Sequence, residues 1–147
     1  MNILVIEDNQ LKRDKLCDFL SANFSVELTE AASYNSGLKA LLDRDFDLLV
    51  LDMSMPTFDR TAATNGGRFR DLGGKEIAIR LKKQGRLIPF VVVTGYSDFS
   101  VNAENLSISQ IDEILKTLGD DYKGCVFFDA VESVWKEQLM EIIRRMA

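Results

Sequence analysis

The stretch LLVLDMSMP, residues 48–56, joins an apolar run to an aspartate and, four residues later, a proline. An unbroken apolar run of this kind is typical of a strand that is buried on both faces of a parallel sheet. A buried carboxylate without a partner is costly, so we expect Asp52 to lie where the strand ends, near water or a cation. The rest of the sequence has to explain why an acidic residue follows a buried strand at this position.

Outward from this stretch, short apolar runs alternate with segments of helical periodicity along the whole chain. The expected strands are residues 3–6, 25–31, 46–52, 89–95 and 125–128. The expected helices are residues 10–23, 34–45, 74–85, 107–119 and 133–146. Five such βα units predict one doubly wound α/β domain over residues 1–147. In such domains the functional groups lie at the carboxyl ends of the strands.

Composition narrows the classes of function. A net charge of −5 and a pI near 4.8 argue against nucleic acid as the main partner. No apolar run approaches the length of a membrane span, and no basic leader precedes the first strand, so we expect a cytoplasmic protein with reduced cysteines. The absence of histidine excludes a histidine general base, a histidine-ligated zinc site and a phosphohistidine in this chain.

One polar, glycine-rich segment, residues 57–75, interrupts the alternation and is called the insertion below. Connections in α/β units usually run to about 2–6 residues, and this one is much longer. A lid, a contact loop and a solvated mobile loop are all consistent with its composition.

Acidic residues follow two of the expected strands. Glu7 and Asp8 come after the first, and Asp52 comes after the third. If these strands are neighbours, the carboxylates converge, and a proton or cation must relieve their repulsion. An open pocket lined with oxygen atoms favours Mg²⁺. The alternative is that each acid is a helix N-cap. Thr94 adds a hydroxyl at the end of the fourth strand, at the same edge.

Three segments, ILVIEDN, LLVLDMSMP and PFVVVTGY, together resemble the receiver domains of two-component response regulators, over nearly the whole chain. The resemblance implies a flavodoxin-like (CheY-like) (βα)5 fold with a five-stranded parallel sheet of order 2-1-3-4-5. It also implies that Asp52 is the phosphoacceptor and that Thr94 is the switch hydroxyl. The Mg²⁺ ligands would be Glu7, Asp8, Asp52 and the backbone carbonyl of Ser54.

The partners follow from the same resemblance. A stand-alone or excised receiver takes its phosphoryl group from a sensor histidine kinase or a phosphotransfer protein. It then signals through contacts with a downstream protein, or through a homodimer formed by the fourth helix, fifth strand and fifth helix. Neither nucleic acid nor membrane is expected as a partner, and the domain is expected to be a signalling module rather than an enzyme.

The resemblance fails at the end of the fifth strand. Receivers carry a lysine there, but this sequence reads GCVFFDAVESVW and places Phe128 or Asp129 at that position. The aromatic switch position falls on Cys125 or Val126. Cations that could replace the lysine from elsewhere in the chain are Arg68, Arg70, Lys75 and Lys123.

Three functions therefore remain open at this stage. The first is a phosphorylated receiver with a substitute cation, and the second is a pseudo-receiver that binds partners without phosphorylation. The third is a Mg²⁺-dependent phosphohydrolase with Asp52 as nucleophile. That third function lacks its general acid, because the second aspartate of such enzymes is replaced by Ser54.

Overall fold

The structure is a computed structural model that describes residues 1–96, 98–101 and 104–146, with the backbone alone given at 98–101 and 104–105. Within these ranges no helix is both long and apolar enough to cross a membrane. Cys17 and Cys125 are free thiols of intermediate exposure. Burial raises the pKa of each thiol to about 12, so both stay protonated near neutral pH.

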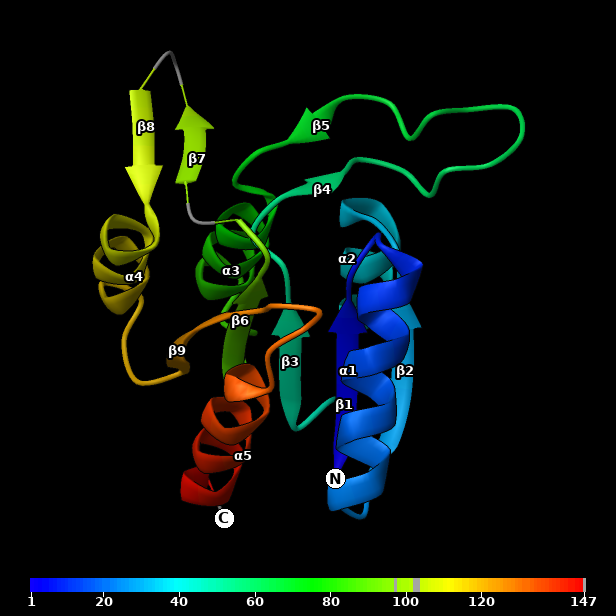
Figure 1. The fold of residues 1–147 in the computed structure, drawn as a ribbon. Coiled ribbons are helices and arrows are strands. Elements are labelled where there is room, and N and C mark those ends of the chain that lie inside the picture. The colour runs from blue at the N-terminus through cyan, green and yellow to red at the C-terminus, as the bar shows by residue number, and fades with distance from the viewer. Residues whose placement is uncertain (97, 102–103, 147) are drawn as a thin grey trace.

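A five-stranded parallel sheet forms the centre of the molecule (Figure 1). Its strands are β2 (Glu27–Ala31), β1 (Asn2–Ile6), β3 (Leu48–Leu51), β6 (Phe90–Thr94) and β9 (Tyr122–Phe127), in that spatial order. In chain order these are the second, first, third, fourth and fifth strands of the sheet, so the predicted order 2-1-3-4-5 is confirmed. The last strand begins three residues earlier than the predicted 125–128.

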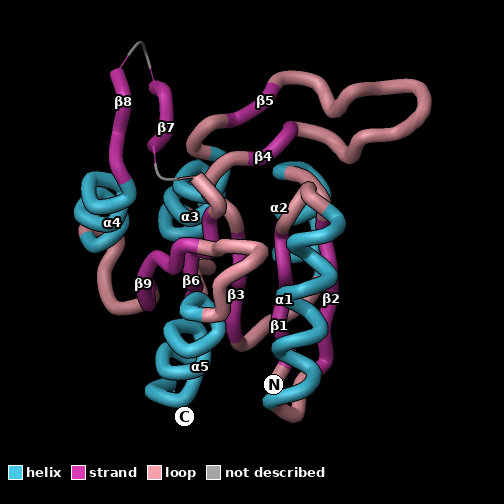
Figure 2. The backbone as a smooth tube through the Cα atoms, in the orientation of Figure 1, coloured by secondary structure: helices cyan, strands magenta, loops and turns pink. Residues whose placement is uncertain are grey.

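In the described part of the chain, five helices cover the two faces of the sheet (Figure 2). They are α1 (Gln10–Asn23), α2 (Tyr34–Asp43), α3 (Gly73–Lys83), α4 (Ile108–Lys116) and α5 (Val134–Met146). Helices α1 and α5 pack on one face, and α2, α3 and α4 pack on the other. The predicted helix at residues 10–23 is confirmed to the residue.

Alternate residues of each central strand enter two separate cores. In β1, Ile3 and Val5 face α1 and α5, whereas Leu4 and Ile6 face the other helices. All four side chains are fully buried, as a strand covered on both faces requires. Because both cores hold the strand, the position of the residue that follows it is fixed.

Two antiparallel ribbons lie outside the main sheet. Strands β4 (Met55–Pro56) and β5 (Phe69–Arg70) pair at the ends of the insertion, which extends beyond the carboxyl edge of the sheet (Figure 1). Strands β7 (Asp98–Val101) and β8 (Glu104–Ser107) pair before α4. The sequence predicted neither ribbon, because both consist of very short or polar strands.

Candidate functional site

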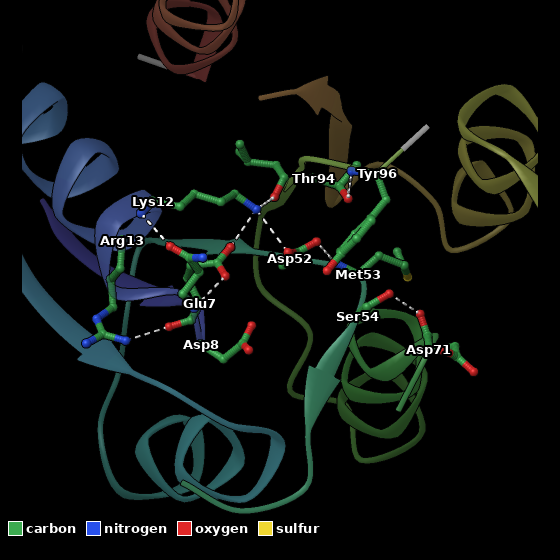
Figure 3. Close-up of polar contacts among 12 residues, drawn as sticks. Glu7, Asp8, Lys12, Arg13, Asp52, Met53, Ser54, Asp71, Thr94 and Tyr96 are labelled. Atoms are coloured by element: carbon green, nitrogen blue, oxygen red, sulfur yellow. Dashed lines mark hydrogen bonds and ion pairs between the residues drawn. The ribbon is translucent and has the colours of Figure 1, made fainter. Parts of the chain in front are cut away.

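The acidic residues meet at the carboxyl edge of the sheet. Strands β1 and β3 pair in parallel with Ile6 opposite Leu51, so the residues that follow them emerge side by side. One carboxylate oxygen from each of Glu7, Asp8 and Asp52 lies within 4.8 Å of the others. The structure therefore brings together the three acids that the sequence pointed to (Figure 3).

A lysine that the sequence reasoning missed lies between two of these acids. The Lys12 ammonium is 2.5 Å from Glu7 Oε1 and 2.9 Å from Asp52 Oδ2. It also donates to the backbone carbonyl of Val93, at 2.7 Å. Figure 3 shows the side chain reaching from α1 to both carboxylates. Lys12 is buried, as are Glu7 and Asp52, so water screens these charges only weakly.

The local sequence explains how Lys12 reaches the site. Asn9 caps α1, and its side chain accepts the backbone N–H of Lys12, which places that residue in the first helical turn. Side chains in a helix tilt toward its N-terminus, so Lys12 points back over the carboxyl edge of the sheet. A cation in the first turn opposes the helix dipole. The sequence therefore offered one signal: a lysine at an unfavourable position in the first helical turn, close in the chain to Glu7 and Asp8. Such a lysine is expected to contact a carboxylate.

Burial and charge act in opposite directions on this ion pair. Burial is the largest influence on Glu7 and raises its pKa to about 8, against the attraction of Lys12. Burial also opposes the charge of Lys12, but Asp52 and Glu7 outweigh it and raise the pKa of Lys12 above its usual value. Lys12 is therefore a permanent cation near neutral pH, and Glu7 is the group of the pair that takes up a proton.

The other predicted site residues surround Asp52. The backbone N–H of Met53 donates to Asp52 Oδ1 at 2.6 Å, so both carboxylate oxygens have a partner. Ser54 is buried, and its hydroxyl donates to the Asp71 carbonyl at 2.7 Å. Thr94 ends β6, fully buried, and its hydroxyl accepts the N–H of Tyr96 at 3.2 Å.

The insertion contributes a second cation to the acidic cluster. Arg60 Nη1 lies 2.8 Å from Asp8 Oδ2, with the arginine side chain half exposed. The neighbouring Asp59 accepts the hydroxyls of Ser33 and Ser36, at 2.6 and 2.8 Å, which ties the base of the insertion to the start of α2. Each acid of the cluster thus has a cationic partner in the described structure.

The cations that the sequence analysis proposed as replacements for the lysine do not pair with Asp52 among the described residues. Arg70 forms an ion pair with Glu76 at 2.8 Å and stacks over the ring of Tyr34. Among the described residues, the ion pairs of Asp52 involve neither Arg70 nor the remaining candidates, Arg68, Lys75 and Lys123. The hypothesis that one of these four cations replaces the missing lysine therefore gains no support from the described ion pairs of Asp52, whose cationic partner is Lys12, in the first turn of the helix that follows β1.

The end of β9 carries aromatic residues where the family pattern has a lysine. Phe127 pairs in register with Thr94, and the N–H of Phe128 donates to the Thr94 carbonyl at 2.8 Å. The buried ring of Phe128 packs against Trp135, with centroids 5.0 Å apart. The Lys12 ammonium lies 5.7 Å from the centroid of the same ring.

The donor set fits a hard divalent cation. Three carboxylates from two neighbouring strand ends supply oxygen ligands, the type that Mg²⁺ prefers. Glu7 Oε1 is buried and, although close to Lys12, lacks a partner in hydrogen-bond geometry among the described residues. An ion at this site would compete with Lys12 and Arg60 for the same oxygens.

Comparison with known proteins identifies the family of the chain. No protein-family model matches the chain. The chain is 31% identical to the Detocs response regulatory protein DtcB of Enterobacter cloacae, over 99% of this chain and all of that protein. The chain belongs to the response regulator receiver family. This receiver domain is also 31% identical to the transcriptional regulatory protein FixJ of Bradyrhizobium diazoefficiens, over 82% of the chain and 51% of that protein.

A solved structure of the family shows the same fold. The response regulator TrrA of Thermotoga maritima, solved in complex with Mg²⁺ and beryllofluoride, superposes with a TM-score of 0.63. The match covers 96% of this receiver domain and 97% of that chain, at 20% identity. At this identity the likeness establishes the flavodoxin-like fold. It does not assign roles to individual residues, which are argued from their contacts and charges.

Proposed function

We propose that this receiver domain accepts a phosphoryl group on Asp52 in a Mg²⁺-dependent reaction and signals through protein–protein contacts. The observation that carries the proposal is the convergence of Glu7, Asp8 and Asp52 within 4.8 Å at the carboxyl edge of the sheet. Glu7, Asp8, Asp52 and the Ser54 carbonyl are the residues that would hold the ion. When bound, Mg²⁺ neutralises charge on the phosphoryl oxygens.

Positioning is what the protein itself contributes to the reaction. Asp52 is fixed by β3 below it and by the Met53 N–H on Oδ1, so Oδ2 is the oxygen that faces the cluster. Oδ2 attacks the phosphorus, and the bond from phosphorus to the donor atom breaks, with its electron pair leaving on the donor. Thr94, at the end of the neighbouring β6, is the hydroxyl that would turn toward the new phosphoryl group.

The phosphoryl donor must come from another molecule if it is a phosphohistidine, because this chain contains no histidine. We propose a sensor histidine kinase or a phosphotransfer protein as that partner. Phosphorylation would add about two negative charges beside Thr94, at the end of β6, next to β9. The α4–β9–α5 face is therefore the proposed surface for a downstream protein or a homodimer.

Chemical phosphorylation tests the proposal directly. The protein is incubated with acetyl phosphate and Mg²⁺, and intact mass spectrometry is used to look for the mass of one phosphoryl group. We expect one adduct on the native chain and none on Asp52→Asn, which is nearly isosteric but cannot act as the nucleophile. Addition of EDTA should also prevent the adduct. An adduct that persists in Asp52→Asn, or the absence of any adduct, would refute the assignment.

One observation favours a second candidate, the pseudo-receiver that works without phosphorylation. Lys12 and Arg60 already neutralise the acidic cluster with cations of the chain itself, so the fold can hold these acids without a metal ion. The same experiment separates the two functions. A pseudo-receiver would give no Asp52-dependent adduct and no beryllofluoride response at millimolar Mg²⁺.

A further inference from the structure

A positive side chain that contacts the phosphoryl group has to come from an element other than β9. Phe128 and Asp129, which stand where the family pattern has its lysine, carry no positive charge. Phe128 is buried against Trp135, and its N–H donates to the Thr94 carbonyl of β6, so the side chain at this position is an aromatic ring packed in the core.

Lys12, on α1, supplies a cation beside Asp52. Its ammonium contacts Asp52 Oδ2 at 2.9 Å and is anchored by the carbonyl of Val93, the residue before Thr94. The same ammonium lies 5.7 Å from the ring centroid of Phe128, in the range of a cation–π contact. The Phe128 ring is uncharged, but its contact with Lys12 favours a cation beside Asp52.

Competing cations are committed to other partners. On α1, Arg13 bonds the Glu7 carbonyl and Glu30, and Lys15 bonds the Ala130 carbonyl. Arg60 pairs with Asp8 rather than with Asp52. Among the described residues, Lys12 is the cation within ion-pair distance of the nucleophile.

The geometry points to Lys12 as the residue that contacts the phosphoryl group on Asp52, replacing from the first turn of α1 the lysine missing after β9. This inference rests on the proposed function. During transfer, the phosphorus–oxygen bond to Asp52 forms and the bond to the donor breaks. Lys12 keeps its proton and moves its hydrogen bond from the carboxylate oxygen to a phosphoryl oxygen, where the negative charge has increased.

The test compares Lys12→Met with the matched control Lys39→Met, which removes an exposed lysine from α2. Rates of adduct formation with acetyl phosphate are measured at saturating Mg²⁺, after circular dichroism has established that each variant is folded. Loss of a hydrogen bond to a charged group predicts a fall of about 10- to 100-fold for Lys12→Met. Beryllofluoride affinity should fall in parallel, and Lys39→Met should behave as the native chain.

A variant that moves the lysine to the end of β9 distinguishes direct contact with the phosphoryl group from support of the fold. In the double variant Lys12→Met/Phe128→Lys, the charge returns from the end of β9, and we expect the rate to recover at least 5-fold over Lys12→Met. Lys12→Arg, which retains the charge at its own position, serves as the second check and should retain the rate within about 5-fold. A lysine that only supports the fold would leave the rate of adduct formation in a folded Lys12→Met variant close to the native rate.

The outcomes distinguish this inference from the proposed function. Adduct formation on Asp52 at the native rate in Lys12→Met would overturn the role of Lys12 and leave the phosphoacceptor intact. A folded double variant and a folded Lys12→Arg that both stay as slow as Lys12→Met would also overturn it. Absence of any Asp52-dependent adduct on the native chain would overturn both proposals.

Discussion

The carboxyl edge of the sheet has two halves that follow the family pattern to different extents. On the β1–β3 side, Glu7, Asp8 and Asp52 stand directly after their strands and converge on one point. On the β6–β9 side, Thr94 ends β6, but β9 ends at Phe127 and is followed by Phe128 and Asp129, neither of which is a cation. The cation on which the second half would rely comes instead from α1, which belongs to the first half.

This difference shows that an element other than β9 can place a cation beside Asp52. Lys12 reaches Asp52 because it lies in the first turn of α1, which closely follows β1, and β1 pairs with β3, the strand that Asp52 follows. The centroid of the Phe128 ring lies 5.7 Å from the same ammonium. A lysine on α1 and an aromatic residue after β9 are therefore complementary parts of one arrangement.

The largest expected effect concerns the stability of the β1–β3 half. Lys12→Met leaves the buried Asp52 carboxylate without its cation, and breaking a buried ion pair from one side costs about 3–5 kcal/mol. Urea unfolding in EDTA measures this cost, with Lys39→Met expected within about 0.5 kcal/mol of the native chain. Mg²⁺ should restore part of the loss, because it supplies another cation. Equal stability of Lys12→Met and the native chain would show that the ion pair is not a structural element.

The second effect is a dependence of stability on pH. Burial raises the folded-state pKa of Glu7 to about 8, above its unfolded value, so the folded chain holds a proton that the unfolded chain releases. This contribution is fully favourable below the unfolded pKa and is lost as pH rises toward 8. In EDTA the free energy of unfolding should fall by about 2 kcal/mol between pH values of about 5.5 and 7.5.

Because the chain has no histidine, few other side chains titrate between pH values of about 5.5 and 7.5. The change in stability over this range can therefore be assigned to Glu7. Glu7→Gln should remove most of the slope, since glutamine carries no proton to release. Urea midpoints at several pH values provide the measurement. A native chain whose stability rises over the same window would contradict the protonation assigned to Glu7.

The sequence predicted the fold and the acidic cluster because both follow from strong local patterns. Buried strands such as residues 48–51 have uninterrupted apolar runs, and parallel neighbours bring the residues after them to one edge. Lys12 escaped notice because helical spacing defines a face of α1 but not which cation on that face bends back to the sheet. The β4–β5 ribbon escaped because two-residue strands leave no alternation to detect.

A third effect compares how tightly the two halves are packed. A Cβ added at Gly74, at the start of α3, would lie 2.5 Å from the backbone oxygen of Asp52, whereas one at Gly95, after β6, would meet nothing closer than 3.8 Å. Gly74→Ala should therefore destabilise the fold by about 1–2 kcal/mol, as overpacking does. Gly95→Ala, the matched control, should change it by less than about 0.5 kcal/mol. Similar costs in urea unfolding would mean that the β1–β3 half is no tighter than the other.

The smallest effect concerns the cation contributed by the insertion. Arg60 is half exposed and contacts Asp8, so its ion pair contributes less than about 1 kcal/mol to stability. The same charge competes with an ion for Asp8, and its removal in Arg60→Ala should strengthen Mg²⁺ binding by about 3- to 5-fold. Isothermal titration with Mg²⁺ measures this, with Arg68→Ala as the control, because Arg68 is an exposed arginine of the same insertion. Unchanged or weaker binding in Arg60→Ala would show that the insertion does not compete for the acidic cluster, leaving Lys12 as the cation that an incoming ion must displace.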